Sequence, residues 1–200
     1  MKEQIESLRA FLDASHSVYH AQNFLKRTLE EGGYTRLPEQ ADWRLAPGGK
    51  YYVERGGSAL AAFRIPEGQP TGFLMSASHL DRPCFKVKEN FELNGACLRM
   101  AVERYGGQIL HTWLDRPLSV AGRVTVETDR GVENRLVDID RDLLLIPSVA
   151  IHMNRQVNDG YHWNPAVDML PLLGGKDSAG RLAAELERQA GGKILGHDLY

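Results

Sequence analysis

The hydrophobic pattern of this 200-residue chain changes from a helical period to a strand period, and this change constrains its fold more than any other feature. In the first 31 residues, apolar side chains recur every three or four positions, which predicts two amphipathic helices separated by a break at residues 13–17. Ser15 or Ser17 is suited to cap the second helix, and Gly32-Gly33 is suited to end it. From residue 50 onward, turn residues and short apolar runs predict strands instead.

The strand signals begin with a hairpin and a buried strand. Residues 51–53 and 59–65 flank a turn at Gly56-Gly57, which predicts two antiparallel strands. The apolar run at residues 72–77 predicts a buried strand that leads directly into His79 and Asp81.

After Pro83 the pattern is almost entirely that of strands. The sequence predicts a hairpin around residues 129–131, a strand at 143–153 interrupted by Pro147, a loop at 158–171, and a helix at 179–190 ended by Gly191-Gly192. We therefore expect two units, an α/β unit at residues 1–82 and a β-rich unit at residues 83–200.

Composition excludes several classes of protein. The chain has 24 basic and 26 acidic residues and no long basic run, which argues against a nucleic-acid partner. No apolar stretch approaches the ~18 residues of a membrane span, and the charged start lacks the apolar core of a secretory signal. Two cysteines without a CxxC pair favour reduced thiols. We expect a cytoplasmic protein with no membrane partner.

The first candidate for chemistry is the triplet His79-Leu80-Asp81. On an extended backbone, residues two positions apart point to the same side, so the carboxylate can orient the imidazole. A carboxylate that fixes a histidine is a frequent part of a metal site. The alternative is a structural histidine at a strand end that is held by a loop carboxylate.

The second candidate is the segment from His111 to Arg116, where His, Trp, Asp and Arg occur within six residues. Such a density of recognition side chains is unusual. The alternative is that Trp113 belongs to the core and that Asp115 and Arg116 form a surface pair.

Other residues carry weaker signals. His152 alternates with apolar residues and is expected to lie in the core or at an interface. The alternating Asp138, Asp140 and Asp142 fit a solvated strand edge better than a cation site. Cys84 fits a packing role better than that of a nucleophile in a cysteine hydrolase.

Five segments, in this order, resemble the aspartyl aminopeptidase (aminopeptidase I type) family of zinc metallopeptidases. They are FLDASHSVYHA, GGKYYVERGGSALAAF, SASHLDRPCFKVKEN, YGGQILHTWLDRPLSVAGRV and IPSVAIHMNRQVN. The resemblance implies the N-terminal portion of an α/β/α zinc-peptidase domain, at residues 1–82, followed by most of an inserted β-rich dimerisation domain, at residues 83–200, which we expect to be incomplete.

The resemblance also implies an activity and a site. It implies an aminopeptidase that removes N-terminal, typically acidic, residues from peptides with two Zn²⁺ ions per complete site, although other divalent metals can occupy such sites. His79 matches the first metal-binding histidine, and Asp81 matches the acid that orients it, which makes Asp81 the candidate catalytic residue. His111 matches a histidine that reaches a neighbouring subunit's site and binds substrate. The implied assembly is a homo-oligomer, a dimer that builds a dodecamer.

Two departures from the family pattern bear on activity. Leu80 and Arg82 replace the small polar residues that usually flank the acid, and Arg82 adds a cation near the metal position. The family's other metal ligands lie C-terminal to the inserted domain, beyond Tyr200, and one histidine cannot hold two zinc ions. We therefore expect the 200-residue chain alone to be inactive. The alternative function is a non-catalytic module that acts in self-association.

Overall fold

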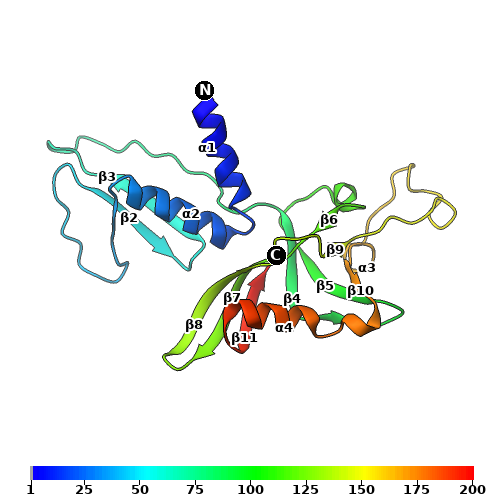
Figure 1. Cartoon of the computed structure of the whole chain (residues 1–200). Helices are drawn as coiled ribbons and strands as arrows, with labels where there is room; N and C mark the ends of the chain where they lie inside the picture. The colour runs from blue at the N-terminus through cyan, green and yellow to red at the C-terminus, as the bar shows by residue number, and fades with distance from the viewer. Residues whose placement is uncertain (1) are drawn as a thin grey trace. The chain divides into compact units, whose positions relative to one another are not determined.

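The computed structural model describes residues 2–200 as two compact units, which follow one another along the chain at Arg82-Pro83 (Figure 1). The first unit contains two helices and a three-stranded sheet. Its elements are α1 (Lys2–Asp13), α2 (Val18–Glu31), β1 (Thr35–Arg36), β2 (Lys50–Arg55) and β3 (Ala59–Arg64). The two helices and the β2–β3 hairpin confirm the predictions made from the hydrophobic period.

The break between the two helices is a capped corner. Ser17 is the N-cap of α2, and its hydroxyl accepts a hydrogen bond from the backbone amide of His20. Gly32 ends the helix. Phe11 of α1 and Phe24 of α2 pack edge to face with ring centroids 5.5 Å apart, which holds the two helices together at this corner.

Helix α2 is joined to the sheet by a buried tyrosine and a polar pair. The strands are in the order β1-β2-β3, with β1 parallel and β3 antiparallel to β2. Tyr52 of β2 is fully buried, and its hydroxyl donates a 2.6 Å hydrogen bond to Glu30 of α2. Burial, with the Glu30 carboxylate next, raises the pKa of Tyr52 to about 12. Gln22 of α2 donates to Glu54 of β2 in the same way.

The expectation of a buried strand at residues 72–77 is wrong. This segment forms no strand, and the side chains of Phe73, Leu74 and Met75 are each at least 86% exposed. An apolar strand becomes buried only when neighbouring strands and covering helices pack against it. None of the strands in the described part of the chain pairs with this segment, so its apolar side chains face solvent.

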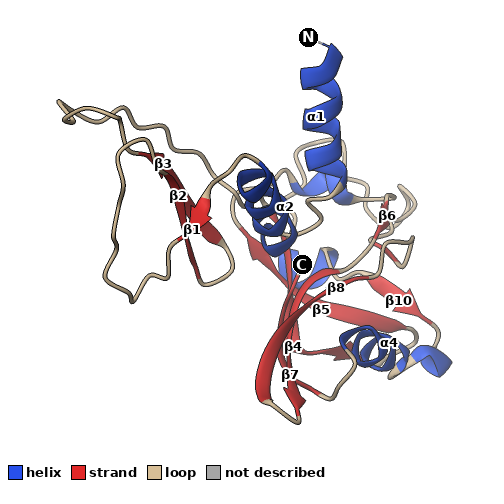
Figure 2. Cartoon of the chain, turned by 60° about the vertical axis from the view of Figure 1, so that its left-hand side comes forward, coloured by secondary structure: helices blue, strands red, loops and turns tan. Residues whose placement is uncertain are grey.

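The second unit is built mainly of strands (Figure 2). They form a five-stranded sheet in the order β4-β5-β10-β9-β6 and a three-stranded sheet in the order β11-β7-β8. Its strands are β4 (Cys84–Leu93), β5 (Leu98–Tyr105), β6 (Pro117–Leu118), β7 (Ala121–Thr128), β8 (Gly131–Asp138), β9 (Leu144–Leu145), β10 (Leu172–Gly174) and β11 (Ile194–Leu199). Its helices are η1 (Leu110–Trp113), α3 (Pro165–Asp168), η2 (Lys176–Ser178) and α4 (Arg181–Ala190).

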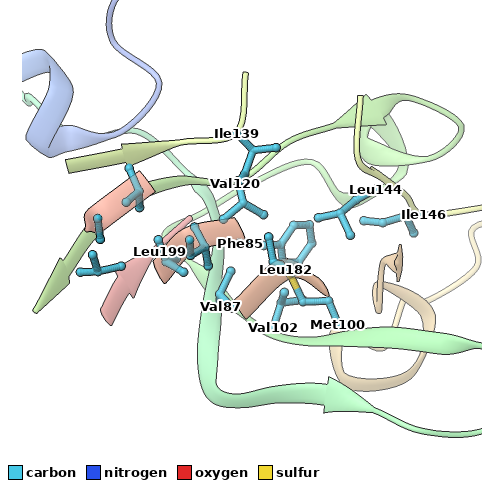
Figure 3. Close-up of a cluster of buried hydrophobic side chains, with 14 of the residues drawn as sticks. Phe85, Val87, Met100, Val102, Val120, Ile139, Leu144, Ile146, Leu182 and Leu199 are labelled. Atoms are coloured by element: carbon cyan, nitrogen blue, oxygen red, sulfur yellow. The ribbon is translucent and has the colours of Figure 1, made fainter. Parts of the chain in front are cut away.

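The core of this unit lies between its two sheets and α4. Phe85 and Val87 of β4 face the core together with Val120, and Leu182 from α4 joins them (Figure 3). Gln189 at the end of α4 pairs with the backbone of Asp138 on the edge strand β8, accepting from its amide and donating to its carbonyl. The hairpin β7–β8 and helix α4, which ends at Gly191, confirm the sequence predictions.

Strand β11 was missing from the sequence predictions, and one glycine shows where it packs. An added Cβ at Gly122 of β7 would lie 2.2 Å from the carbonyl oxygen of Asp198, so only glycine lets β11 approach so closely. The strand expected at 143–153 shortens to β9, because Pro147 lacks the amide that would continue the ladder. The loop expected at 158–171 contains the short helix α3. None of the helices in residues 2–200 is long and apolar enough to cross a membrane.

Candidate functional site

His79 and Asp81 lie side by side at the end of the first unit. Nδ1 of His79 is 2.8 Å from Oδ1 of Asp81, so the two side chains meet as predicted, although the backbone bends at Leu80 and does not form the expected strand. An ionised carboxylate can only accept, so the proton of the neutral ring must be on Nδ1 and the lone pair on Nε2. The His79 side chain is 92% exposed and Asp81 is 33% exposed. This arrangement presents Nε2 to solvent, where it can bind a metal ion.

The expected setting of this pair is different in the structure. The sequence predicts His79 at the carboxyl end of a buried strand, but the preceding segment is exposed and has no strand structure. Arg82, the residue after the pair, contacts the corner between α1 and α2. Its Nη2 donates a hydrogen bond to the carbonyl oxygen of His16. Arg82 therefore points one of its donors at the protein backbone.

The residues present do not fit a complete zinc site. Zinc takes about four donors, and a two-metal site needs more. In the part of the chain that the structure describes, no three His, Cys, Asp or Glu side chains lie close enough together to hold a metal ion. His79 and Asp81 thus fit one oriented ligand of a metal centre and not the centre itself.

His111 lies in the second unit, on the short helix η1, with its side chain exposed. The helix is anchored by Trp113, whose ring packs edge to face on Phe85 at a centroid distance of 5.0 Å. Trp113 is therefore a partly buried residue packed against the core, as the alternative interpretation of this segment predicts. It holds His111 at the surface.

Asp115 does not form the surface pair with Arg116 that the alternative predicts. It accepts hydrogen bonds from the backbone amide of Ser148, at 2.9 Å, and from its hydroxyl, at 2.6 Å. These bonds, that of the hydroxyl first, hold the pKa of Asp115 below its usual value. Sequence reasoning could not find Ser148, because it lies 33 residues away with no motif connecting the two.

In the described part of the chain, the weaker candidates do not come together in a metal site. His152 is exposed on the loop after Pro147, so a core position for it is wrong. Asp140 and Asp142 are exposed, and the described residues contain no metal-holding cluster there. Cys97 lines an open pocket of about 620 Å³ together with five leucines, at residues 143–145 and 172–173, and with Asp115 and Asp142.

His197 has no partner at ligand spacing in the sequence, and the structure buries it. Its side chain is buried on β11 with the ring packed on Phe91, 5.9 Å between centroids. Within the described residues, neither of its ring nitrogens has a hydrogen-bond partner. Its position two residues before the buried Leu199, at the spacing of a strand, was the available signal.

The comparisons with known proteins all indicate the same peptidase family. Residues 11–195 match the family model described as aminopeptidase I zinc metalloprotease (M18). A probable M18 family aminopeptidase 2 of Clostridium acetobutylicum is 42% identical over 183 residues, which cover 87% of this chain and 42% of the relative. The protein of the same name from Pseudomonas aeruginosa is 41% identical over 171 residues, covering 84% and 40%. The chain thus spans about two fifths of the length of these relatives.

Solved structures show the same partial coverage. The structure of the Ape4 and Nbr1 complex matches with a TM-score of 0.85 and 33% identity, over 95% of this chain and 42% of the other. Chaetomium thermophilum mApe1 matches with a TM-score of 0.85 and 27% identity, over 96% and 49%. An M18 family aminopeptidase of Thermotoga maritima, at 19% identity and a TM-score of 0.75, shows the fold alone.

Proposed function

Because this chain belongs to the aminopeptidase I (M18) zinc metalloprotease family, we propose that it supplies the first metal ligand of a metallo-aminopeptidase site. The reaction is the removal of N-terminal residues from peptides, and the resemblance of its motifs favours acidic residues as the ones removed. The chain spans 42% of the Clostridium relative. The aminopeptidase activity of a full-length enzyme is therefore a proposal that rests on the family.

The single observation that carries this proposal is the His79–Asp81 pair. The 2.8 Å contact fixes the ring through Nδ1 and leaves Nε2 directed to solvent. A carboxylate behind a histidine makes the ring a better metal ligand and fixes its orientation.

In a complete site, His79 would hold one of two divalent ions, and such a pair would supply activation of a water molecule and polarisation of the scissile carbonyl group. The described residues offer one ligand to such a centre, so the other donors must come from outside them. Zinc is the metal that the family name supports. Cobalt and manganese suit the same donor types.

We further propose that His111 binds substrate at the site of a neighbouring subunit. His111 is exposed on η1, and Trp113 packs this short helix against the core. Such a position suits a side chain that contacts a neighbouring subunit. The yeast mApe1 structure, 23% identical, is described as a dodecamer. A homo-oligomer of this chain is a proposal that follows from the family.

A second candidate function is a non-catalytic module that associates with itself. The observation that favours it is the incomplete ligand set together with exposed apolar residues on the loop after Pro147, among them Val149, Ile151 and Met153. Exposed apolar groups gathered on one segment are typical of contact surfaces.

A chimera separates the two functions. The chain is joined to the part of the Clostridium relative that it does not match, and hydrolysis of glutamyl and aspartyl p-nitroanilides is measured with zinc and with chelator. The aminopeptidase proposal predicts chelator-sensitive hydrolysis by the chimera, its loss in His79→Ala, and its retention in the matched control His162→Ala, an exposed histidine elsewhere. A folded, oligomeric chimera that neither binds zinc nor hydrolyses these substrates supports the module instead.

A further inference from the structure

The turn between β4 and β5 contains an asparagine that is followed directly by a glycine. Asn94 and Gly95 are both exposed, and the turn runs from them to the start of β5 at Leu98. Asn94 is the only asparagine in the sequence that a glycine follows. The turn therefore places a side-chain amide beside a backbone nitrogen that no side chain of its own residue shields.

The two amides are not held by the rest of the turn. Within residues 2–200, neither the Asn94 side chain nor the backbone amide of Gly95 makes a hydrogen bond. The space beside Gly95 is also open, because an added Cβ would meet only the carbonyl oxygen of Cys97, at the ordinary contact distance of 3.6 Å. The Asn94 side chain can therefore turn toward the nitrogen of Gly95.

This arrangement favours a reaction between the two neighbours. The Gly95 nitrogen loses its proton to hydroxide and attacks Cγ of Asn94. The new C–N bond closes a succinimide ring, the Cγ–Nδ2 bond breaks, and the leaving nitrogen takes a proton from water and departs as ammonia, which regenerates hydroxide. Water then adds to one of the ring carbonyl groups and opens the ring. Opening at one carbonyl gives aspartate, and opening at the other gives isoaspartate, in which the backbone runs through the former side chain.

The asparagines elsewhere in the chain lack this combination, since a residue with a side chain follows each of them. Asn158 also lies in an exposed loop, but the next amide, that of Asp159, donates a 2.9 Å hydrogen bond to the carbonyl of Gln156. Asn134 lies within strand β8, where the ladder to β7 holds the backbone. An open, exposed turn is where a thermolabile residue such as asparagine reacts most readily.

We propose that Asn94 is a site of spontaneous covalent modification, which converts its amide to a carboxylate and, in the isoaspartyl form, lengthens the backbone of the β4–β5 turn. An aspartate carboxyl has a pKa of about 3.9, so the modified chain carries an additional negative charge at neutral pH. The longer backbone lies close to a buried position, because Leu98 is fully buried and pairs with Gly174 of β10. This inference is independent of the metal-site proposal.

The test incubates the folded 200-residue chain at neutral and at mildly alkaline pH and follows the tryptic peptide of residues 89–99 by mass spectrometry. Fragment spectra distinguish Asn94 from Asn90, which lies in the same peptide. We expect Asn94 to acquire the mass of a carboxylate, with isoaspartate among the products, at a rate that rises in proportion to the hydroxide concentration. Asn158 is the internal control and should stay unmodified over the same period.

Gly95→Ala tests the mechanism, because the added methyl group fits the turn but crowds the attacking nitrogen. We expect no modification of this variant over the same period, and nearly equal rates in the folded and the urea-unfolded wild type. Modification of Gly95→Ala at the wild-type rate would overturn the proposal. A folded wild type in which Asn94 stays intact would also overturn it, whether or not the unfolded chain reacts.

Asn94→Asp separates the added charge from the longer backbone, because it supplies only the charge. We expect Asn94→Asp to keep the thermal midpoint of the unmodified chain, and the purified isoaspartyl chain to unfold at a lower temperature. Equal midpoints for the isoaspartyl chain and Asn94→Asp would contradict the predicted effect on the turn.

Discussion

Asp115 and Ser148 form a two-bond clamp between the short helix that carries His111 and the chain after β9. The carboxylate accepts from both the amide and the hydroxyl of Ser148, and the Asp115 amide donates to the carbonyl of Ile146 at 2.9 Å. Asp115 makes these bonds from a left-handed backbone conformation, with φ at 56°. Aspartate tolerates this conformation better than most residues do.

Removing the clamp should loosen the loop in a pH-dependent way. We expect Asp115→Ala to lower the thermal midpoint at pH 7 and to speed hydrogen exchange of the Ser148 amide, while Asp115→Asn, which keeps the backbone preference, has a smaller effect. The folded-state pKa of Asp115 lies below its unfolded value of about 3.9. The contribution is therefore complete above that pH and disappears as the pH falls through the folded-state pKa. A gap between wild type and Asp115→Ala that does not shrink in acid would contradict the clamp.

Tyr52 should make the first unit sensitive to alkali. Its pKa of about 12 exceeds the unfolded value of about 10, so the folded state holds the proton more tightly. Stability should therefore fall between pH 10 and 12, and Tyr52→Phe should remove this slope. At neutral pH the loss of the bond to Glu30 should cost about 0.5–1.5 kcal/mol. Urea unfolding at pH 8 and pH 11 checks both effects. Equal alkaline slopes in the two proteins would rule out this role for the buried hydroxyl.

The exposed apolar run should matter for association and hardly at all for stability of the chain. Phe73→Ser with Leu74→Ser removes two fully exposed apolar side chains. The free energy of unfolding should change by less than ~0.5 kcal/mol, because surface substitutions rarely do more. Concentration-dependent self-association, measured by sedimentation, should decrease. Leu37→Ala, at a buried position in the same unit, should instead destabilise by about 2–5 kcal/mol. A comparable loss in the double variant would show that the run is buried in solution.

Gly122 tests the packing of β11 against β7. An added methyl group would meet the backbone of Asp198, so Gly122→Ala should cost at least ~1–3 kcal/mol, the range for overpacking, because a backbone atom cannot move aside easily. Gly196→Ala on the facing strand is the matched control, since a methyl group added there would meet no atom within 4 Å. Chemical denaturation of both variants measures the difference. Equal stability of the two would mean that the strands lie farther apart.

Local features of the fold were predictable from the sequence. The apolar spacing within α1, which includes Phe11, and within α2, which includes Phe24, joins residues a few positions apart. The same holds for the cap at Ser17 and the glycine after α4. The contact between His79 and Asp81 also joins near neighbours in the sequence, although the backbone between them bends at Leu80. Such features depend on backbone geometry and near neighbours, which a sequence displays directly.

Features that depend on distant partners were not predictable. The run at 72–77 has the composition of a buried strand, yet burial depends on neighbouring strands that the described residues do not supply. Ser148 and the carbonyl of His16 are partners that no spacing rule connects to Asp115 or Arg82. The Leu80 and Arg82 substitutions marked the segment as unusual, and only the structure shows where the arginine reaches.

The central claim is that His79 binds metal through Nε2 while Asp81 holds Nδ1. Long-range ¹H–¹⁵N spectra of the histidine rings during addition of Zn²⁺ test it most directly. We predict that the Nε2 signal of His79 shifts on zinc addition, that Nδ1 stays protonated, and that Asp81→Asn weakens the response, while the exposed His162 does not respond at matched concentrations. A His79 ring whose nitrogens do not respond to zinc, or which binds it through Nδ1, would contradict the account.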